Sequence, residues 1–404
     1  MVWYLMPSEV DLRESRAGFV KRVVQIVMLV CAFAGFNLSY AGQSDAQNTA
    51  AQPIVITDIA GRTVTLPKPA SRVVLTQARY FPVLGMIHPD PVSILAGWSD
   101  EFKNSYAEEY AEYQRRFPAI ERIPVVGQHT AASFSVERAL AVKPDVVIMT
   151  AAFAGIRPNT GNAAASSSPL IRRFEAAGVP VVVVDFFIDP LNNTVPSMRI
   201  LGQVLGYPER AQAFISYYEA HMQRIAQGVA TLKHRPDVLV HAHAGATGCC
   251  NSPGVGTFNE MIQYAGGHNI GEDVLQTPTG QLGLEYIIRR NPAVYVATGT
   301  GSNRLKGLVV GADVALADAQ QSLRRVVQQS RLQPIMAVQS ANAHGIWHGF
   351  NDSPLNVVFI EALATWINPD AFSDVSAQKT LDEISERFLL VPMHGTYLID
   401  WEKP

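Results

Sequence analysis

The sequence predicts an α/β protein of two Rossmann-like lobes, each with a central, mainly parallel sheet, joined by one long α-helix. Strands and helices alternate along most of the chain. The expected strands, such as "DVVIMT" (145–150) and "VPVVVVD" (179–185), are apolar throughout, which is typical of parallel strands covered on both faces. The stretch 194–232 is long and helical and interrupts this alternation, so we expect it to connect two lobes.

The first lobe is expected at residues 53–191. It opens with a β-hairpin in "IVITDIAGRTVTLP" (54–67), where two short strands flank the turn "AGR". Further strands are expected at "SRVVLT" (71–76) and "VSILAGW" (92–98). In "SVERALAVKP" the apolar residues recur at helical spacing, and this helix must stop before Pro144.

The second lobe is expected at residues 235–404, after a helical linker at 192–234. The apolar runs "DVLVHAHA" (237–244) and "IMAVQ" (335–339) are interpreted as strands. The stretch "NAHGIWHGFND" (342–352) is interpreted as a loop that follows a strand. Helices complete the lobe on either side of its sheet.

Residues 1–41 are expected to be a signal peptide of a soluble exported protein. A Lys-Arg pair at 21–22 precedes the apolar run "VVQIVMLVCAFAGF", and small residues allow cleavage near Ala41. The run is short and is followed at once by polar residues, so it does not fit a membrane span. We therefore expect the mature chain in the periplasm, with 42–52 as a flexible leader.

Composition excludes two other classes of protein. A hydrophobic content of 48% with 17% charged residues indicates a globular chain and not a disordered one. The net charge of −3, without a basic cluster, argues against nucleic-acid binding, because phosphate contacts need clustered Lys and Arg.

One unit occurs twice along the chain. In "FSVERALAVKPDVVIMT" and "LGLEYIIRRNPAVYVAT" a glutamate, Glu137 or Glu285, is followed seven residues later by a proline. An apolar run then ends at Thr150 or Thr298. The echo is consistent with two lobes that share a plan, although helix, proline and strand also follow one another by chance in α/β folds.

These segments resemble a known family. "ITDIAGRTVTLPKPASRVV", the two repeated units, the long helix and "FNEMIQYAGGHNIG" are together similar to periplasmic binding proteins of the iron-siderophore and cobalamin type, which serve ABC importers. The resemblance covers roughly residues 53–390. It implies a periplasmic substrate-binding protein, not an enzyme, that captures an iron chelate (siderophore or haem-like) in an inter-lobe cleft. It also implies no intrinsic cofactor, because the Fe(III) chelate is the cargo.

The resemblance further implies that one exposed glutamate on each lobe docks onto an ABC permease dimer at the inner membrane. By position these are Glu137 and Glu285. A carboxylate in the first turn of a helix is favoured by the helix dipole and is a good partner for arginine. The alternative is that both residues only stabilise their helices.

Ligand-binding residues are expected in the loops after the strands, because ligands of open α/β sheets bind beyond the carboxyl ends of the strands. Aromatic rings there suit the organic shell of a chelate, and arginine suits its carboxylates. The candidates are Arg79, Tyr80, Trp98, Phe153, Arg157, His241, His243, Arg304, Trp347, His348 and Phe350.

Histidines concentrate in the second lobe. His241 and His243 are two residues apart on an expected strand and would share one face. His348 follows in the later loop, and we interpret His243 and His348 as candidate contacts to a chelated metal. Another chelate (cobalamin, nickel or cobalt) or a bare Zn or Mn ion is the alternative cargo.

A third alternative is an exported metal-dependent hydrolase that uses His241 and His243, with Asp352 as the nearest carboxylate candidate. Neither a G-x-S-x-G elbow nor a complete phosphate-binding loop supports an enzyme. Cys249 and Cys250 are adjacent, and in an oxidising compartment they form either a vicinal disulfide or two small buried thiols.

Overall fold

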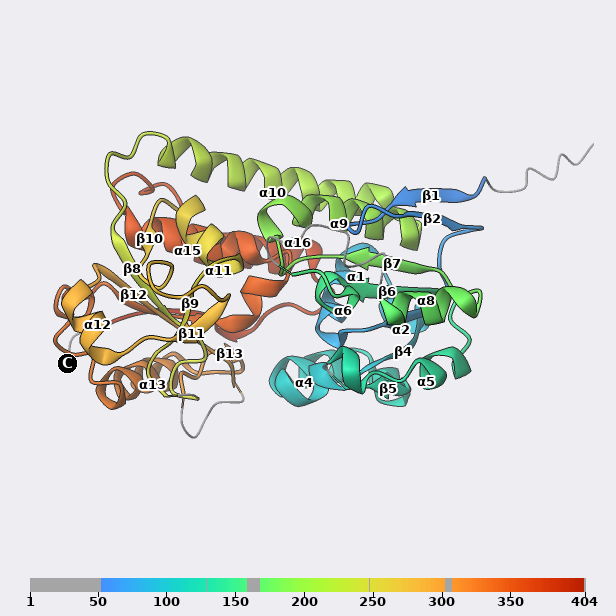
Figure 1. Ribbon diagram of the computed structural model, residues 1–404, viewed down its shortest axis with the longest axis horizontal. Coiled ribbons are helices and arrows are strands. Elements are labelled where there is room, and N and C mark those ends of the chain that lie inside the picture. Colours follow the sequence, from blue (N-terminus) through green and yellow to red (C-terminus); the bar gives the residue numbers. More distant parts are fainter. Residues whose placement is uncertain (1–51, 129, 158–167, 247, 302–306, 403–404) are drawn as a thin grey trace, which may run out of the picture. The chain divides into compact units, whose positions relative to one another are not determined.

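Two five-stranded sheets organise the chain in the computed structural model (Figure 1). The structure describes residues 52–128, 130–157, 168–246, 248–301 and 307–402. The expected signal peptide and almost all of the leader lie outside these residues. Within the described residues, no helix combines the length and the apolar character needed to cross a membrane.

The first sheet has the order β5-β4-β3-β6-β7, and all its pairs are parallel. The hairpin expected at 54–67 is present as an antiparallel pair ahead of this sheet. The strands are β1 (Ile54–Thr57), β2 (Thr63–Leu66), β3 (Val73–Leu75), β4 (Leu95–Ser99), β5 (Val125–Gly127), β6 (Val146–Thr150) and β7 (Val181–Val184).

The second sheet has the order β10-β8-β12-β14-β16 and is parallel except for its last strand. The same part of the chain also forms two separate short antiparallel pairs, β9 with β11 and β13 with β15. The strands are β8 (Asp237–His241), β9 (Asn251–Pro253), β10 (His268–Asn269), β11 (Thr279–Gln281), β12 (Val294–Gly299), β13 (Gly311–Ala312), β14 (Ala343–Trp347), β15 (Gly395–Thr396) and β16 (Leu398–Asp400).

Helices cover both faces of each sheet, and strand alternation assigns each side chain to one layer. Val146 and Ile148 of β6 join one apolar core, whereas Val147 and Met149 join another. The helices are α1 (Phe81–Ile87), α2 (Pro91–Ile94), α3 (Glu101–Ser105), α4 (Ala107–Arg116), α5 (Val136–Ala141), α6 (Ala151–Ala154), α8 (Pro169–Ala176), α9 (Pro190–Leu205), α10 (Pro208–Val229), α11 (Thr257–Tyr264), α12 (Leu284–Arg290), α13 (Leu316–Gln329), α14 (Met336–Gln339), α15 (Asn356–Ile367) and α16 (Ala377–Phe388).

The long helix between the sheets is α10, which has 22 residues and is about 33 Å long. Figure 1 shows it running alongside both halves of the fold. It contacts α1 on one side and α11 and α15 on the other. The helical stretch expected at 194–232 is divided in two, because Gly206 adopts a left-handed conformation and Pro208 starts the next helix. The predicted fold class is confirmed; the lobe boundaries near 191 and 235 stay predictions.

The repeated unit has the same local structure in both sheets. Glu137 and Glu285 are each the second residue of their helices, α5 and α12. Each helix is followed by a residue with left-handed φ, Lys143 at 51° and Asn291 at 48°, immediately before the proline. The strands that follow have equivalent places in their sheets: β6 lies between β3 and β7, and β12 lies between β8 and β14. The echo in the sequence therefore marks a shared structural unit.

Two elements of the second half differ from expectation. The run "IMAVQ" forms helix α14 and not a strand, because a short apolar run does not distinguish the two structures. The asparagine side chain of Asn291 accepts a hydrogen bond from the backbone N–H of Met336 and fixes its start. The strand lies instead at β14, where the sequence predicted a loop, and pairs in parallel with β12.

Candidate functional site

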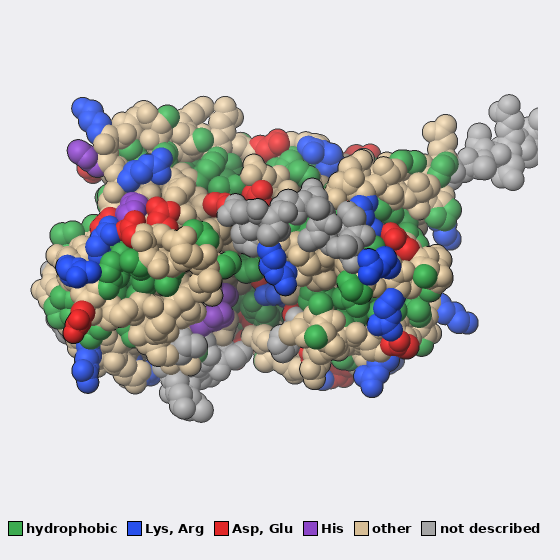
Figure 2. All heavy atoms as spheres, viewed as in Figure 1, with side chains coloured by type: hydrophobic (Ala, Val, Ile, Leu, Met, Phe, Trp, Pro, Cys, Tyr) green, Lys and Arg blue, Asp and Glu red, His purple; other side chains and the backbone are tan. Residues whose placement is uncertain are grey.

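Polar side chains follow the carboxyl ends of parallel strands in both sheets. Arg79 follows β3 and Glu101 follows β4 in the first sheet. His243 follows β8, and His348 follows β14 at the start of a 3₁₀ turn, His348–Asp352, in the second sheet. Figure 2 shows histidine side chains at the edge of a hollow between the two halves of the described fold. This placement agrees with the rule that located the candidate loops.

Arg79 connects the two halves of the site. Its guanidinium forms an ion pair with Asp352 of the second half, and its Nε lies 3.4 Å from Oε1 of Glu101. The carboxylate side chains are almost completely buried, and that of Arg79 is 28% exposed. The carboxylates of Asp352 and Glu101 hold the pKa of Arg79 above its usual value, against the effect of burial. The arginine therefore ties the halves together and keeps one accessible face.

The rings of His243 and His348 lie against one another, with centroids 3.7 Å apart and planes tilted by 32°. Thr298, at the end of β12, joins them: its hydroxyl accepts a hydrogen bond from the backbone N–H of His243 at 3.0 Å and lies 2.8 Å from Nδ1 of His348. Three neighbouring strands thus fix two imidazoles at one point of the cleft wall.

Both imidazoles are held in the neutral form. Burial lowers the pKa of His243, and the nearby Arg79 cation lowers it further. Burial lowers the pKa of His348 well below its ordinary value, and His243 and Arg79 add to this effect. At neutral pH these rings carry free nitrogen lone pairs, which is the form that binds metal.

A small cavity of about 70 Å³ lies beside this cluster and takes its walls from both halves. Tyr106 and Trp347 meet across it in an edge-to-face contact with centroids 5.8 Å apart. Glu109 of α4 reaches over to the second half, where its Oε1 accepts a hydrogen bond of 3.4 Å from the backbone N–H of Ala312. Ligand pockets usually measure several hundred Å³, so this inner cavity is too small for a chelate.

The stability of the protein should depend on pH through Glu109. Burial raises the pKa of Glu109 from 4.5 to about 7. Between these values the folded chain holds a proton that the unfolded chain has released, so the free energy of unfolding falls as pH rises, by at most about 3 kcal/mol. A glutamine at this position cannot ionise, so the free energy of unfolding of Glu109→Gln should not show this decrease as pH rises. Urea unfolding of both chains at pH 5 and pH 8 measures it; equal pH dependence in the two chains would contradict the assignment.

Four of the predicted aromatic residues pack in the interior. Tyr80 contacts Phe186, and Trp98 packs edge-on against Phe81. Each of the four is at most 5% exposed; they are Tyr80, Trp98, Phe153 and Phe350. Of the five predicted aromatics, Trp347 alone is partly exposed.

The remaining predicted residues divide into three groups. His241 and His243 do not share a strand face as expected, because β8 ends at His241 and the chain turns with a φ of 50° at His243. His241 is fully buried and faces Tyr295 and not the cleft cluster. Arg157 donates hydrogen bonds to the backbone oxygens at the end of α6. Arg304 lies outside the described residues.

Sequence reasoning missed several residues that pair with Arg79 or line the inner cavity. Glu101 begins helix α3, just after β4, in a stretch that the strand-end rule selected as a loop, but a lone carboxylate there gave no signal of its pairing. Tyr106 and Glu109 lie on or next to α4, away from any strand end, so only their contacts across the halves reveal them. Asp352 was considered only as a hydrolase carboxylate, whereas it pairs with Arg79.

The two predicted docking glutamates are both exposed. Glu137 forms an ion pair with Arg173 of α8, and Ser135 accepts a hydrogen bond of 3.2 Å from the N–H of Arg138 at the start of the helix. Its own backbone N–H and Arg173 lower the pKa of Glu137, so it is ionised at neutral pH. Glu285 has the same position on α12, which starts at a glycine instead.

The fold is that of a two-lobed binding protein, and its candidate site residues come from strand ends of both sheets. The chain belongs to the periplasmic binding protein family, whose model matches residues 87–342. This confirms the resemblance seen in the sequence. The family consists of substrate-binding proteins and not of enzymes, so it gives the hydrolase alternative no support.

Individual relatives are distant. A cobalamin-binding protein of Halobacterium salinarum is 25% identical over 268 residues, which is 66% of this chain and 63% of that protein. The TroA-like periplasmic binding protein FepB from Veillonella parvula superposes with a TM-score of 0.79 at 23% identity, over 87% of this chain and all of that chain. A periplasmic heme binding protein from Pseudomonas aeruginosa gives 0.51 at 19% identity, over 83% and 99%. At these identities the structures show the shared fold.

Proposed function

We propose that the chain captures a metal chelate in the hollow between its lobes and delivers it to an ABC importer. The observation that carries this proposal is the cluster of Arg79, His243 and His348 at the carboxyl ends of strands in both sheets. Family membership supports the transport role, and the expected signal peptide supports export to the periplasm. The cargo we favour is an Fe(III) chelate, siderophore or haem-like.

The donor set favours a chelated metal over a bare ion. Among the described residues, one group of three or more His, Cys, Asp or Glu side chains has the spacing of metal ligands, and it is not in the cleft. A bare Zn or Mn ion needs nearly complete coordination by the protein. Two neutral imidazoles and one arginine can instead complete a metal and bind an anionic shell that the chelator already provides.

Each residue then has a distinct role in binding. His348 or His243 offers a ring nitrogen to the metal or to a polar group of the shell, with Thr298 orienting the pair. Trp347 offers an apolar face, and Arg79 offers its accessible face to a carboxylate. Because the inner cavity is too small, the chelate would occupy the open hollow outside it.

A cobalamin is the second candidate cargo, and the relative from Halobacterium salinarum favours it. Its cobalt centre accepts an imidazole, as an iron chelate does. Native mass spectrometry of the chain purified from its own cell envelope tests the proposal and separates the candidates. We expect one adduct per chain whose mass includes both a metal and an organic shell.

Delivery would use the matched glutamates. Glu137 and Glu285 occupy the same position in the two copies of the repeated unit, one in each lobe. Two symmetric subunits of a permease could therefore each receive one carboxylate. The ion pair of Glu137 with Arg173 is exposed and contributes little to stability, so an arginine of a permease could replace it.

A further inference from the structure

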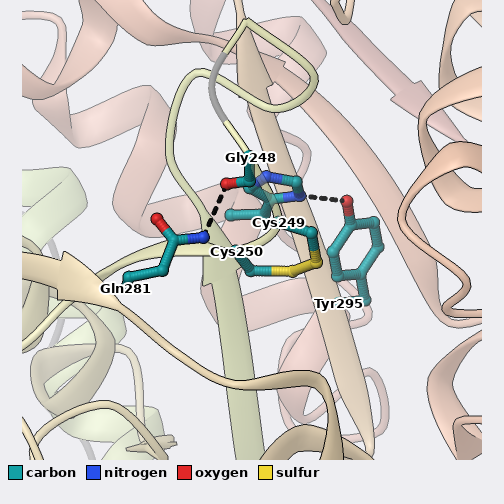
Figure 3. The surroundings of a disulfide bond; sticks show 6 residues. Gly248, Cys249, Cys250, Gln281 and Tyr295 are labelled. Atoms are coloured by element: carbon teal, nitrogen blue, oxygen red, sulfur yellow. Dashed lines mark hydrogen bonds between the residues drawn. A yellow bond between two sulfur atoms is a disulfide. The ribbon is translucent and has the colours of Figure 1, made fainter.

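Cys249 and Cys250 form a disulfide next to a buried histidine, away from the Arg79 cluster. Figure 3 shows the disulfide on the loop after β8, with Gln281 on one side and Tyr295 on the other. A ring nitrogen of His241 and the two Sγ atoms all lie within 4.8 Å of one another. None of these three residues is needed for the proposed chelate site.

His241 has an unused ligand atom. Its Nδ1 lies 3.0 Å from the hydroxyl of Tyr295, and its buried Nε2 has no hydrogen-bond partner among the described residues. The side chain is fully buried. A buried ring nitrogen without a partner is unfavourable unless something else satisfies it.

The sulfur atoms are held in place beside the His241 ring. The backbone of Cys250 exchanges two hydrogen bonds with Leu282, of 3.3 and 3.0 Å. The carbonyl of Gly248 accepts a hydrogen bond of 2.8 Å from the side chain of Gln281. Cys250 is buried, whereas Cys249 is partly exposed, so a small reductant can reach the bond from one side.

We propose that reduction of the Cys249–Cys250 disulfide opens a site for a thiophilic d¹⁰ metal ion, Zn²⁺ or Cu⁺, bound by both sulfurs and Nε2 of His241. In a tetrahedral zinc site with Zn–S bonds of about 2.3 Å, the ligand atoms are about 3.5–4 Å apart. The histidine nitrogen is already within 4.8 Å of both sulfurs, and the sulfurs, bonded to one another in the oxidised chain, would separate once the bond is reduced. Two thiolates neutralise a divalent ion, which suits a buried location. Tyr295 would accept a hydrogen bond from Nδ1–H and leave Nε2 free for the metal.

The disulfide is first reduced by two electrons, and the metal ion then replaces the protons of the two thiols. A dithiol reductant transfers two electrons and two protons to the bond, which becomes two thiols, and leaves as its own disulfide. The ion then displaces both thiol protons and forms two metal–sulfur bonds and one metal–nitrogen bond. In the oxidised chain the sulfurs are bonded to one another, so the site is closed.

Cobalt(II) is the probe, because its thiolate complexes have a charge-transfer absorption in the near ultraviolet. The full chain should carry Cys31→Ser, so that Cys249 and Cys250 supply its only thiols. After reduction with a phosphine and removal of oxygen, we expect one equivalent of Co²⁺ to give this band, and the oxidised chain to give none. Cys250→Ser should abolish the band, and excess Zn²⁺ should displace the cobalt from the reduced chain.

Two variants test the role of the histidine. His241→Gln should weaken Co²⁺ binding by at least about tenfold, the smallest loss expected even for a partner outside the ligand set. If this variant does not fold by circular dichroism, Tyr295→Phe removes only the hydroxyl and should weaken binding in the same direction. The proposal would be overturned if the reduced chain gave no band. It would also be overturned if the His241→Gln and Tyr295→Phe variants bound Co²⁺ as tightly as the chain that keeps both residues. Chelate binding by the oxidised chain is a separate readout, so the two proposals can fail independently.

Discussion

We expect the double charge reversal Glu137→Lys with Glu285→Lys to abolish uptake of the cargo and to leave the affinity for it unchanged. Both side chains are exposed, at the second position of matched helices, and neither contacts the Arg79 cluster. Reversal would place two lysines against the arginines expected on the permease, and like charges in an interface oppose association. Uptake by cells and the dissociation constant of the purified chain are measured in parallel.

The matched control is Glu209→Lys. Glu209 is also an exposed glutamate at the second position of a helix, α10, but it lies outside the repeated unit. It controls for the loss of a favourable interaction with a helix dipole. Uptake should be normal in this variant. Wild-type uptake in the double reversal would show that the two glutamates serve only their helices.

The second large effect is expected on stability. Arg79→Ala should lower the free energy of unfolding by about 3 kcal/mol, because it leaves the buried carboxylate of Asp352 without its arginine partner. Asp352→Asn in the same chain removes this buried charge and should recover part of the loss. Urea unfolding of the four chains of this double-mutant cycle gives the coupling energy between the two residues.

Arg115→Ala is the control for this cycle. Arg115 pairs with Glu112 of the same helix and lies 3.6 Å from Asp313 of the second half, and its side chain is 61% exposed. Removing an exposed partner should change stability far less than removing Arg79. Equal losses at the two positions, or no coupling between Arg79 and Asp352, would mean that the pair does not tie the lobes together.

Much of the fold could be predicted because local signals agreed with one another. Apolar strands such as β6 and β7 are covered on both faces, and Pro144 and Pro292 end their helices as expected. Disagreement arose where a signal was short. The run at 335–339 is apolar enough for a strand, but the strand that the sheet uses is β14, whose sequence "AHGIW" is less apolar.

The site could be predicted only in part, because strand ends identify loops and not the directions of side chains. The rule selected the loops of Arg79, His243 and His348: the two imidazole rings lie against one another, and the Arg79 cation is near enough to lower the pKa of both. It could not distinguish them from Trp98 or Phe350, whose rings turn into the core. Contacts across the lobes, such as that of Glu109 with Ala312, depend on how the halves pack and leave no local pattern.

The disulfide and its neighbouring histidine also show that the sequence did not give the directions of side chains. The adjacent cysteines were visible in the sequence, and both the oxidised and the reduced state were open. His241 was predicted to face the cleft with His243 because strand alternation was extended two residues too far. The turn at His243 separates the two rings, so one belongs to the cleft and the other to the cysteines.

Native mass spectrometry of the chain isolated from its own cell envelope tests the central claim most directly, since it reports metal and organic mass together. We predict one adduct per chain that contains a metal and its chelator. The adduct should be lost in a chain that carries His243→Ala and His348→Ala, with the oxidised Cys249–Cys250 pair as an internal mass check. A bare Zn or Mn ion at one per chain, or an adduct that survives the loss of both histidines, would contradict a chelate held at this cluster.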